Sequence, residues 1–166
     1  MMTLNVNDEV SRLRSVVLGR ADSNGPVPKL EDTYDPKSAE HIKAGTYPLD
    51  TDMVKEMDAV MAVFKKYEVI VHRPKSIENY NQIFSRDTAF VIEDKLIIAN
   101  ILPDREKEIE ALEYVWSMLS KDKIIRLPKE VHAEGGDVMP CGDYIFIGTY
   151  RGEDYADFIT ARTNIE

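Results

Sequence analysis

The feature that most constrains this chain is a stretch in which two glycines lie between two acidic residues, just before a hairpin signal. Residues 134–137 read Glu-Gly-Gly-Asp, and a turn signal at Pro140-Cys141-Gly142-Asp143 leads into the apolar run Tyr144–Ile147. Glycine lets the backbone pass close to other groups and adopt angles that other residues avoid. A carboxylate beside two glycines can therefore be aimed into a pocket, although the tetrapeptide alone favours a surface hairpin with acidic ends.

An earlier stretch of the chain repeats this design. The residues Phe84-Ser85-Arg86-Asp87-Thr88 lead into the apolar segments Thr88–Ile92 and Lys95–Ile98, with Glu93-Asp94 as the turn between them. This pattern predicts a second hairpin, again preceded directly by a carboxylate. Two stretches of the same design favour a functional role for both carboxylates.

Together the two stretches resemble the guanidine-modifying superfamily, which includes arginine deiminases, dimethylarginine dimethylaminohydrolases and arginine:glycine-type amidinotransferases. The resemblance runs from about Glu9 to the last residue, and Phe84–Thr88 and Glu134–Met139 carry it. It implies an α/β pentein fold, a propeller of five ββαβ modules with the active site at its centre. It also implies a nucleophilic cysteine near the C-terminus and a catalytic histidine in the second half. Neither has a counterpart here, so we expect residues 1–166 to form one domain, the N-terminal part of such a catalytic domain.

The predicted elements correspond to about two and a half modules. Buried strands are expected at Ser15–Leu18 and Glu68–His72. Between them lie a long connection over Ala21–Tyr47, with a short helix near Ser38–Lys43, and a helix over Pro48–Tyr67. Asp50, Thr51 or Asp52 would cap that helix, and its apolar face is formed by Met53, Met57, Val60, Met61 and Phe64. Long loops are often functional, and in the superfamily such a connection can cover the site.

The second module contains the first hairpin, a helix that starts at Pro103, and a strand over Lys123–Leu127. We expect the helix to bury the stripe Ile109, Leu112, Val115, Trp116 and Leu119, and to expose Glu106, Glu108, Glu110 and Glu113. A third unit starts with Val138-Met139 and Tyr144–Ile147 and continues with helical character over Asp154–Glu166. No closing strand follows, so we expect a truncated chain whose apolar edges a missing half would cover.

Composition narrows the classes of function. The net charge of −9 disfavours a nucleic-acid partner and suits a cationic small molecule. No segment approaches the length of an apolar membrane span, and residues 1–9 lack the pattern of a secretory signal. The single cysteine, Cys141, fits a reducing compartment, so we expect a cytoplasmic protein. His41, His72 and His132 are isolated in the sequence and have no nearby cysteine pair, so we expect no metal site. The resemblance implies no organic cofactor either.

The resemblance assigns roles to two carboxylates. Asp87 matches the residue that binds the substrate guanidinium, a flat cation whose N–H donors fit a carboxylate; alternatively, it forms a salt bridge with Arg86 or caps the next strand. Glu134 matches the catalytic carboxylate that orients the histidine; alternatively, it is an exposed loop residue. We expect Asp87 and Glu134 to line one cavity, where two carboxylates without a cationic partner would repel each other. Asp137 is expected to fix the glycine turn by hydrogen bonds to backbone N–H groups.

Three further residues match positions that hold the amino-acid end of the substrate in arginine deiminases: Asn81, Arg105 and Arg162. An exposed surface role is the alternative for each, and all three lose the binding role if the substrate has no α-carboxylate. Cys141 lies in a tight turn with no histidine or basic residue next to it, so it is not the expected nucleophile. His132 is expected to be structural.

The sequence therefore predicts part of a guanidino-group-modifying enzyme that acts through a covalent cysteine adduct. Hydrolysis by water and transfer to an amine share this half of the site, so both an amidine hydrolase and an amidinotransferase stay open. The expected partners are a small guanidino or amidino substrate, and either a second copy of the chain or the missing C-terminal half. The alternative is a non-catalytic pentein fragment or binding module that lacks the nucleophile.

Overall fold

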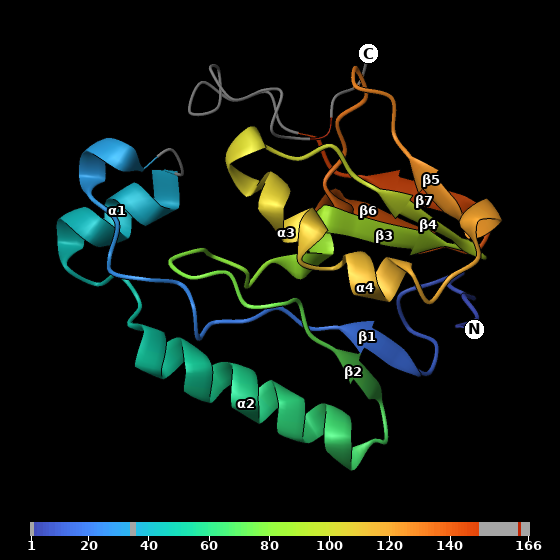
Figure 1. The fold of residues 1–166 in the computed structure, drawn as a ribbon, viewed down its shortest axis with the longest axis horizontal. Helices are drawn as coiled ribbons and strands as arrows, with labels where there is room; N and C mark the ends of the chain where they lie inside the picture. Colours follow the sequence, from blue (N-terminus) through green and yellow to red (C-terminus); the bar gives the residue numbers. More distant parts are fainter. Residues whose placement is uncertain (1, 34–35, 150–162, 164–166) are drawn as a thin grey trace.

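The computed structural model describes residues 2–33, 36–149 and 163, which form three small sheets with helices around them (Figure 1). The first sheet pairs two parallel strands, the second has three strands, and the third is an antiparallel hairpin. Within the described part of the chain these sheets do not close into a propeller, so the architecture is a mixed α/β fold. No helix among the described residues is long and apolar enough to cross a membrane.

The first sheet joins β1 (Ser15–Val17) to β2 (Ile70–His72), with Val16 opposite Val71. Both strands were predicted, but the expectation that they are buried was wrong: β1 is half-buried, and Ile70 in β2 is exposed. The reason is that this sheet has only two strands and that α2, which packs against β2, has no buried residue of its own.

Two helices separate these strands in the sequence. The expected short helix is α1 (Pro36–Ala44), and the longer one is α2 (Asp50–Lys66). The predicted N-cap was wrong, because Leu49 has the extended cap conformation and Asp50 is the first helical residue. An acidic side chain in the first turn still complements the helix dipole. Of the predicted apolar face, Val60 is exposed and the other members are half-buried.

The core lies in the second module. The predicted hairpin is formed by β3 (Ala89–Ile92) and β4 (Lys95–Ile98), and β5 (Ile124–Arg126) runs parallel to β4. Glu93, at the turn, has a φ of 52°. One face of β4 packs against the helical segment that follows, and the buried cluster consists of Leu96, Ile98, Leu112, Val115, Trp116 and Leu119. The predicted stripe is therefore confirmed, with Ile109 packed at its edge.

The segment after Pro103 is not one continuous helix. A 3-10 turn (Pro103–Arg105) leads into α3 (Glu106–Glu110), and α4 (Glu113–Trp116) follows after a break. At the break, the Ala111 carbonyl accepts the Lys75 amide at 2.9 Å, while Val115 N–H donates to Leu112 instead. A long-range partner thus replaces a helical hydrogen bond and bends the segment.

The third sheet consists of β6 (Val138–Cys141) and β7 (Tyr144–Ile147), as predicted. Every residue of β7 is exposed, whereas Val138 and Pro140 in β6 are buried. The helix expected over Asp154–Glu166 falls on residues of which only Thr163 is described, and Thr163 is not helical.

Candidate functional site

The two motifs meet through their 3-10 turns, which are Ser85–Thr88 in the first and Gly135–Asp137 in the second. A Cβ atom on Gly135 would lie 2.1 Å from the Arg86 carbonyl oxygen, and one on Gly136 would lie 2.7 Å from Asp87 Oδ1. The first separation leaves no room for a side chain against fixed backbone, and the second would force the Asp87 carboxylate to move. The glycines therefore allow the second motif to approach the first, as their type predicted.

Arg86 links the two motifs and the N-terminal segment. Its Nε donates to the Gly135 carbonyl at 3.0 Å and its Nη2 to the Val138 carbonyl at 2.9 Å. The same guanidinium forms a two-contact ion pair with Glu9 at 2.8 and 3.2 Å, and this contact raises the pKa of Arg86. Arg86 thus connects these three segments. Its guanidinium bonds to Glu9, Gly135 and Val138, and not to Asp87.

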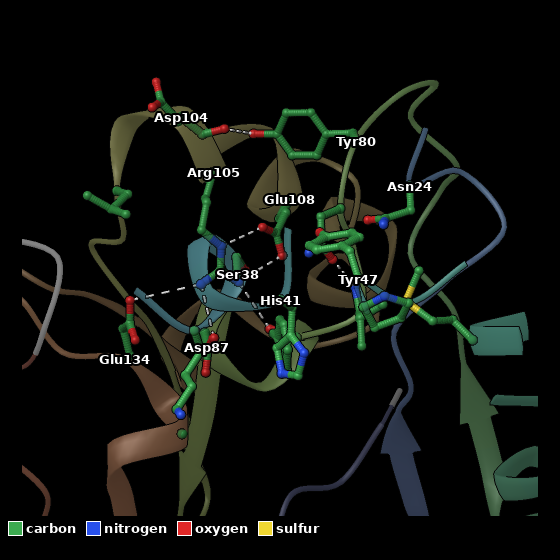
Figure 2. Close-up of a pocket in the computed structure, with 18 of the residues that line it drawn as sticks. Asn24, Ser38, His41, Tyr47, Tyr80, Asp87, Asp104, Arg105, Glu108 and Glu134 are labelled. Atoms are coloured by element: carbon green, nitrogen blue, oxygen red, sulfur yellow. Dashed lines mark hydrogen bonds and ion pairs between the residues drawn. The ribbon is translucent and has the colours of Figure 1, made fainter. Parts of the chain in front are cut away.

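Asp87 and Glu134 line the same cavity, which has a volume of about 780 Å³ (Figure 2). Asn81 and Arg105 also line it, whereas Arg162 lies outside the described residues. Glu134 is only 5% exposed, so the alternative of a solvent-exposed loop carboxylate is wrong. The arrangement places two motif carboxylates and two of the three expected substrate-binding residues around one space; their roles stay predictions.

Arg105 lies at the centre of this arrangement, between three carboxylates (Figure 2). Its Nη1 is 3.0 Å from Asp87 Oδ2 and 3.9 Å from Glu134 Oε1. Its Nε and Nη2 contact the two oxygens of Glu108 at 2.7 and 3.1 Å. Burial by itself would lower the pKa of Arg105, but the contacts with Glu108 and Asp87 outweigh it and raise the pKa. The expectation of two carboxylates without a cationic partner was therefore wrong.

Glu108 is the site residue that the sequence analysis placed wrongly. It was expected on the exposed face of the helix, yet it is 3% exposed and lines the cavity. Burial raises the pKa of Glu108, although the ion pair with Arg105 acts in the opposite direction. The spacing of three residues between Arg105 and Glu108 was visible in the sequence, and such pairs contact each other along a helix.

Thr163 connects the two acidic residues of the second motif. Its hydroxyl donates to Asp137 Oδ2 at 2.8 Å and accepts the Glu134 amide at 3.2 Å. Asp137 is expected to fix the glycine turn through backbone N–H groups, and among the described residues its carboxylate reaches that backbone through the Thr163 hydroxyl. A residue near the end of the chain thus helps to fix the Glu134 backbone.

Part of the cavity lining comes from the connection between β1 and α2. Lys37, Ser38 and His41 of α1 line the cavity together with Tyr47. The connection thus contributes residues to the cavity wall, and its expected role as a cover of the site stays a prediction. The Tyr80 hydroxyl donates to the Asp104 carbonyl, and this contact ties the polar loop before the first motif to the turn that carries Arg105 (Figure 2).

Gln82 is a buried residue of that loop which the sequence analysis did not single out. Its Oε1 accepts the Ile77 amide and its Nε2 donates to the Lys75 carbonyl, both at 2.8 Å. The Gln82 carbonyl also accepts the Arg20 amide at 2.9 Å. Gln82 therefore fixes the loop that carries Asn81, whose own Oδ1 accepts the Ile83 amide at 3.1 Å.

Cys141 and His132 are not among the described residues that line the cavity. Cys141 is an exposed thiol at the end of β6. The described residues contain no group of three or more histidine, cysteine or acidic side chains arranged to hold a metal ion.

Comparison with known proteins gives matches among solved structures. No family model matches the chain, and no curated protein matches its sequence. The structure of a dimethylarginine dimethylaminohydrolase adduct with S-methyl-L-thiocitrulline has a TM-score of 0.64 at 18% identity, over 92% of this chain and 53% of that one. The inosamine-phosphate amidinotransferase of Streptomyces griseus matches with a TM-score of 0.64 at 18% identity, over 87% of this chain and 55% of that one.

A third structure, the dimethylarginine dimethylaminohydrolase of Pseudomonas aeruginosa in complex with citrulline, has a TM-score of 0.62 at 17% identity, over 92% of this chain and 52% of that one. The chain thus spans about half the length of each of these three structures. At this level of identity the matches establish the fold. The chain has the mixed α/β fold of pentein structures, represented by dimethylarginine dimethylaminohydrolases and an amidinotransferase, over about half of their length.

Proposed function

We propose that this chain supplies the guanidinium-binding half of a guanidino-group-modifying enzyme. The observation that carries the proposal is the convergence of Asp87, Glu108 and Glu134 on one guanidinium, that of Arg105, inside a cavity (Figure 2). Carboxylates in such a setting match the planar fork of a guanidinium with charge-assisted hydrogen bonds. The shared fold with enzymes of this class supports the same conclusion.

The chemistry that the resemblance implies has two stages. A cysteine thiolate adds to the guanidinium carbon, the bond from that carbon to the departing nitrogen breaks, and a histidine gives the departing amine its proton. Water or an acceptor amine then displaces the thiolate, which gives hydrolysis or transfer. Asp87 would hold the guanidinium and so fix its carbon for attack. Glu134 would orient the histidine and stabilise its protonated form.

A non-catalytic binding module is the second candidate, and Cys141 is the observation that favours it. Cys141 is the only cysteine in the sequence, and it does not line the cavity. The 166 residues therefore do not place a thiol beside the guanidinium-binding carboxylates. In this reading the chain binds a guanidino compound without converting it.

Calorimetric titration of the chain with small guanidines tests the binding role. We expect Asp87→Asn to weaken binding by about 10- to 100-fold, because each charge-assisted contact is worth about 1.5–3 kcal/mol. Glu110→Gln is the control, since Glu110 is an exposed carboxylate of α3 and is not among the described residues that line the cavity. If the wild type and Asp87→Asn bind the guanidines with equal affinity and have the same circular dichroism, Asp87 does not bind the guanidinium.

Turnover assays separate the enzyme from the binding module. We expect the chain alone to release no citrulline-type or urea-type product from arginine, agmatine or methylated arginines. Product that forms with the wild type and disappears in Cys141→Ser would show that Cys141 is the nucleophile after all. If a thiol-bearing segment restores turnover, Glu134→Gln should slow the chemical step and leave substrate affinity nearly unchanged.

A further inference from the structure

The guanidinium of Arg105 is already committed to protein groups. Nε donates to Glu108, Nη1 donates to Asp87, and Nη2 donates to Glu108 and to the Phe84 carbonyl at 3.4 Å. These contacts use four of the five N–H donors that an arginine has. The remaining donor is on Nη1, which lies 3.9 Å from Glu134. Arg105 therefore has no pair of donors left with which to grip the carboxylate of a ligand.

The rest of the described cavity wall is also unfavourable to an anion. Among the residues that the structure describes, five carboxylate residues line the cavity, against the two cationic residues Lys37 and Arg105. Lys37 is largely exposed, and its ammonium group is paired with Glu40 at 2.7 Å. A carboxylate brought into this space would be desolvated next to like charges, which is costly.

We propose that this site selects guanidines whose tail carries no carboxylate, and that Glu108 is the positioning residue that sets this preference. The inference rests on the proposed function, because it concerns the same cavity. Glu108 acts through Arg105: by holding both Nε and Nη2, it turns the guanidinium toward Asp87 and keeps it from serving as a carboxylate receptor. The ligand class is an alkylguanidine with a neutral or cationic tail.

Three ligands with the same guanidinopropyl group test the preference: arginine, argininamide and agmatine. Argininamide keeps the α-carbon and the α-amine of arginine but removes the negative charge, so it isolates the effect of the carboxylate. With the wild-type chain, we expect agmatine and argininamide to bind at least about tenfold more tightly than arginine in calorimetric titrations, the effect of one charge-assisted contact or more. Arginine that binds as tightly as argininamide, or more tightly, would overturn the inference while leaving the proposed function intact.

The variant Glu108→Gln tests the positioning role. The amide keeps one acceptor oxygen but loses the charge and the second acceptor, so Arg105 is released and becomes available to a carboxylate. We expect the ratio of argininamide affinity to arginine affinity to fall by about fivefold or more in this variant. A purely structural role for Glu108 would weaken all three ligands alike and leave the ratio unchanged.

Arg105→Gln and Glu110→Gln complete the set. Arg105→Gln removes the cation that Glu108→Gln is expected to release, so the preference for argininamide should persist in it, whereas Glu110→Gln should match the wild type. If Glu108→Gln does not fold, the wild-type ratio and Arg105→Gln decide the outcome. If the wild type binds none of the three ligands, both the inference and the proposed function fail. If it binds arginine as tightly as argininamide or more tightly, only the inference fails.

Discussion

The two hairpins of this molecule share one local design and differ in their surroundings. Each follows a 3-10 turn that carries an acidic residue, Asp87 before β3 and Asp137 before β6. In the first hairpin, Leu96 and Ile98 of β4 are buried beneath the helical segment, and β5 pairs with the outer edge of β4. In the second, all four residues of β7 are exposed in the described part of the chain, including Phe146 at 57%.

This difference shows what local sequence does and does not specify. Alternating apolar residues and a turn specify a hairpin in both places. Burial depends on which other segment covers the hairpin, and that segment is encoded elsewhere. An apolar residue should therefore contribute strongly to the free energy of unfolding where another segment covers it, and weakly where it is exposed, whichever hairpin it belongs to.

The largest expected effect comes from truncating a covered strand. Leu96→Ala should lower the free energy of unfolding by about 2–5 kcal/mol, because it empties a packed position. Phe146→Ala, at an exposed position of the other hairpin, should change it by less than about 0.5 kcal/mol. Urea unfolding of both variants measures the difference. Equal losses would mean that β7 is packed against other residues in solution, and the comparison between the hairpins would then fail.

The next effect concerns the contact between the two motifs. Gly135→Ala places a methyl group against the Arg86 carbonyl, so we expect a loss of about 1–3 kcal/mol and strongly weakened guanidine binding. Gly142→Ala is the matched control: it has a φ of 59° with open space around it, so only backbone strain of roughly 1 kcal/mol is expected. Guanidine affinity should survive in Gly142→Ala, and its loss there would contradict a local role for the motif contact.

The smallest effect is a pH dependence from Glu108. Burial raises the pKa of Glu108, so the folded state holds its proton more tightly than the unfolded chain. The stability gained in this way is complete below the unfolded pKa of about 4.3 and is lost as pH rises through the folded pKa. The stability of the wild type relative to Glu108→Gln should therefore decrease with pH across this window.

Urea unfolding at a series of pH values checks this expectation. Phe146→Ala, in the exposed hairpin, should keep the pH dependence of the wild type because it leaves Glu108 untouched. A wild type that instead gains stability relative to Glu108→Gln as pH rises would mean that the ion pair with Arg105 outweighs burial.

The helices and strands could be predicted because their signals are local, whereas the shared cavity was expected from the resemblance to a family with a central site. The carboxylates, the glycines and the hairpins are encoded within short stretches. The apolar spacing of this segment predicts one regular helix with its glutamates facing solvent, and this pattern does not predict the burial of Glu108. The break in that helix depends on Lys75, whose amide takes the Ala111 carbonyl, and no pattern within the helix predicts such a distant partner.

Substrate-holding roles were harder to predict for a different reason. The type and position of Arg105 agree with a receptor for a carboxylate, but its function depends on which partners already occupy its donors. Those partners come from the first motif, from the second motif and from the helix itself. These contacts are seen only in the assembled structure, and the proposed exclusion of a ligand carboxylate rests on them.

Arg86 has a consequence for the order of events in folding. Its contacts reach 49 and 52 residues forward, to Gly135 and Val138, and 77 residues back, to Glu9. Closing such long loops costs chain entropy, and this cost arises before the contacts that stabilise the closed loop have formed. The hypothesis that follows is that the second module, with β3, β4 and β5, folds first and that the contacts of the site form last. Arg86→Ala would then speed unfolding and leave the folding rate nearly unchanged in stopped-flow measurements; a slower folding rate would place the site in the nucleus.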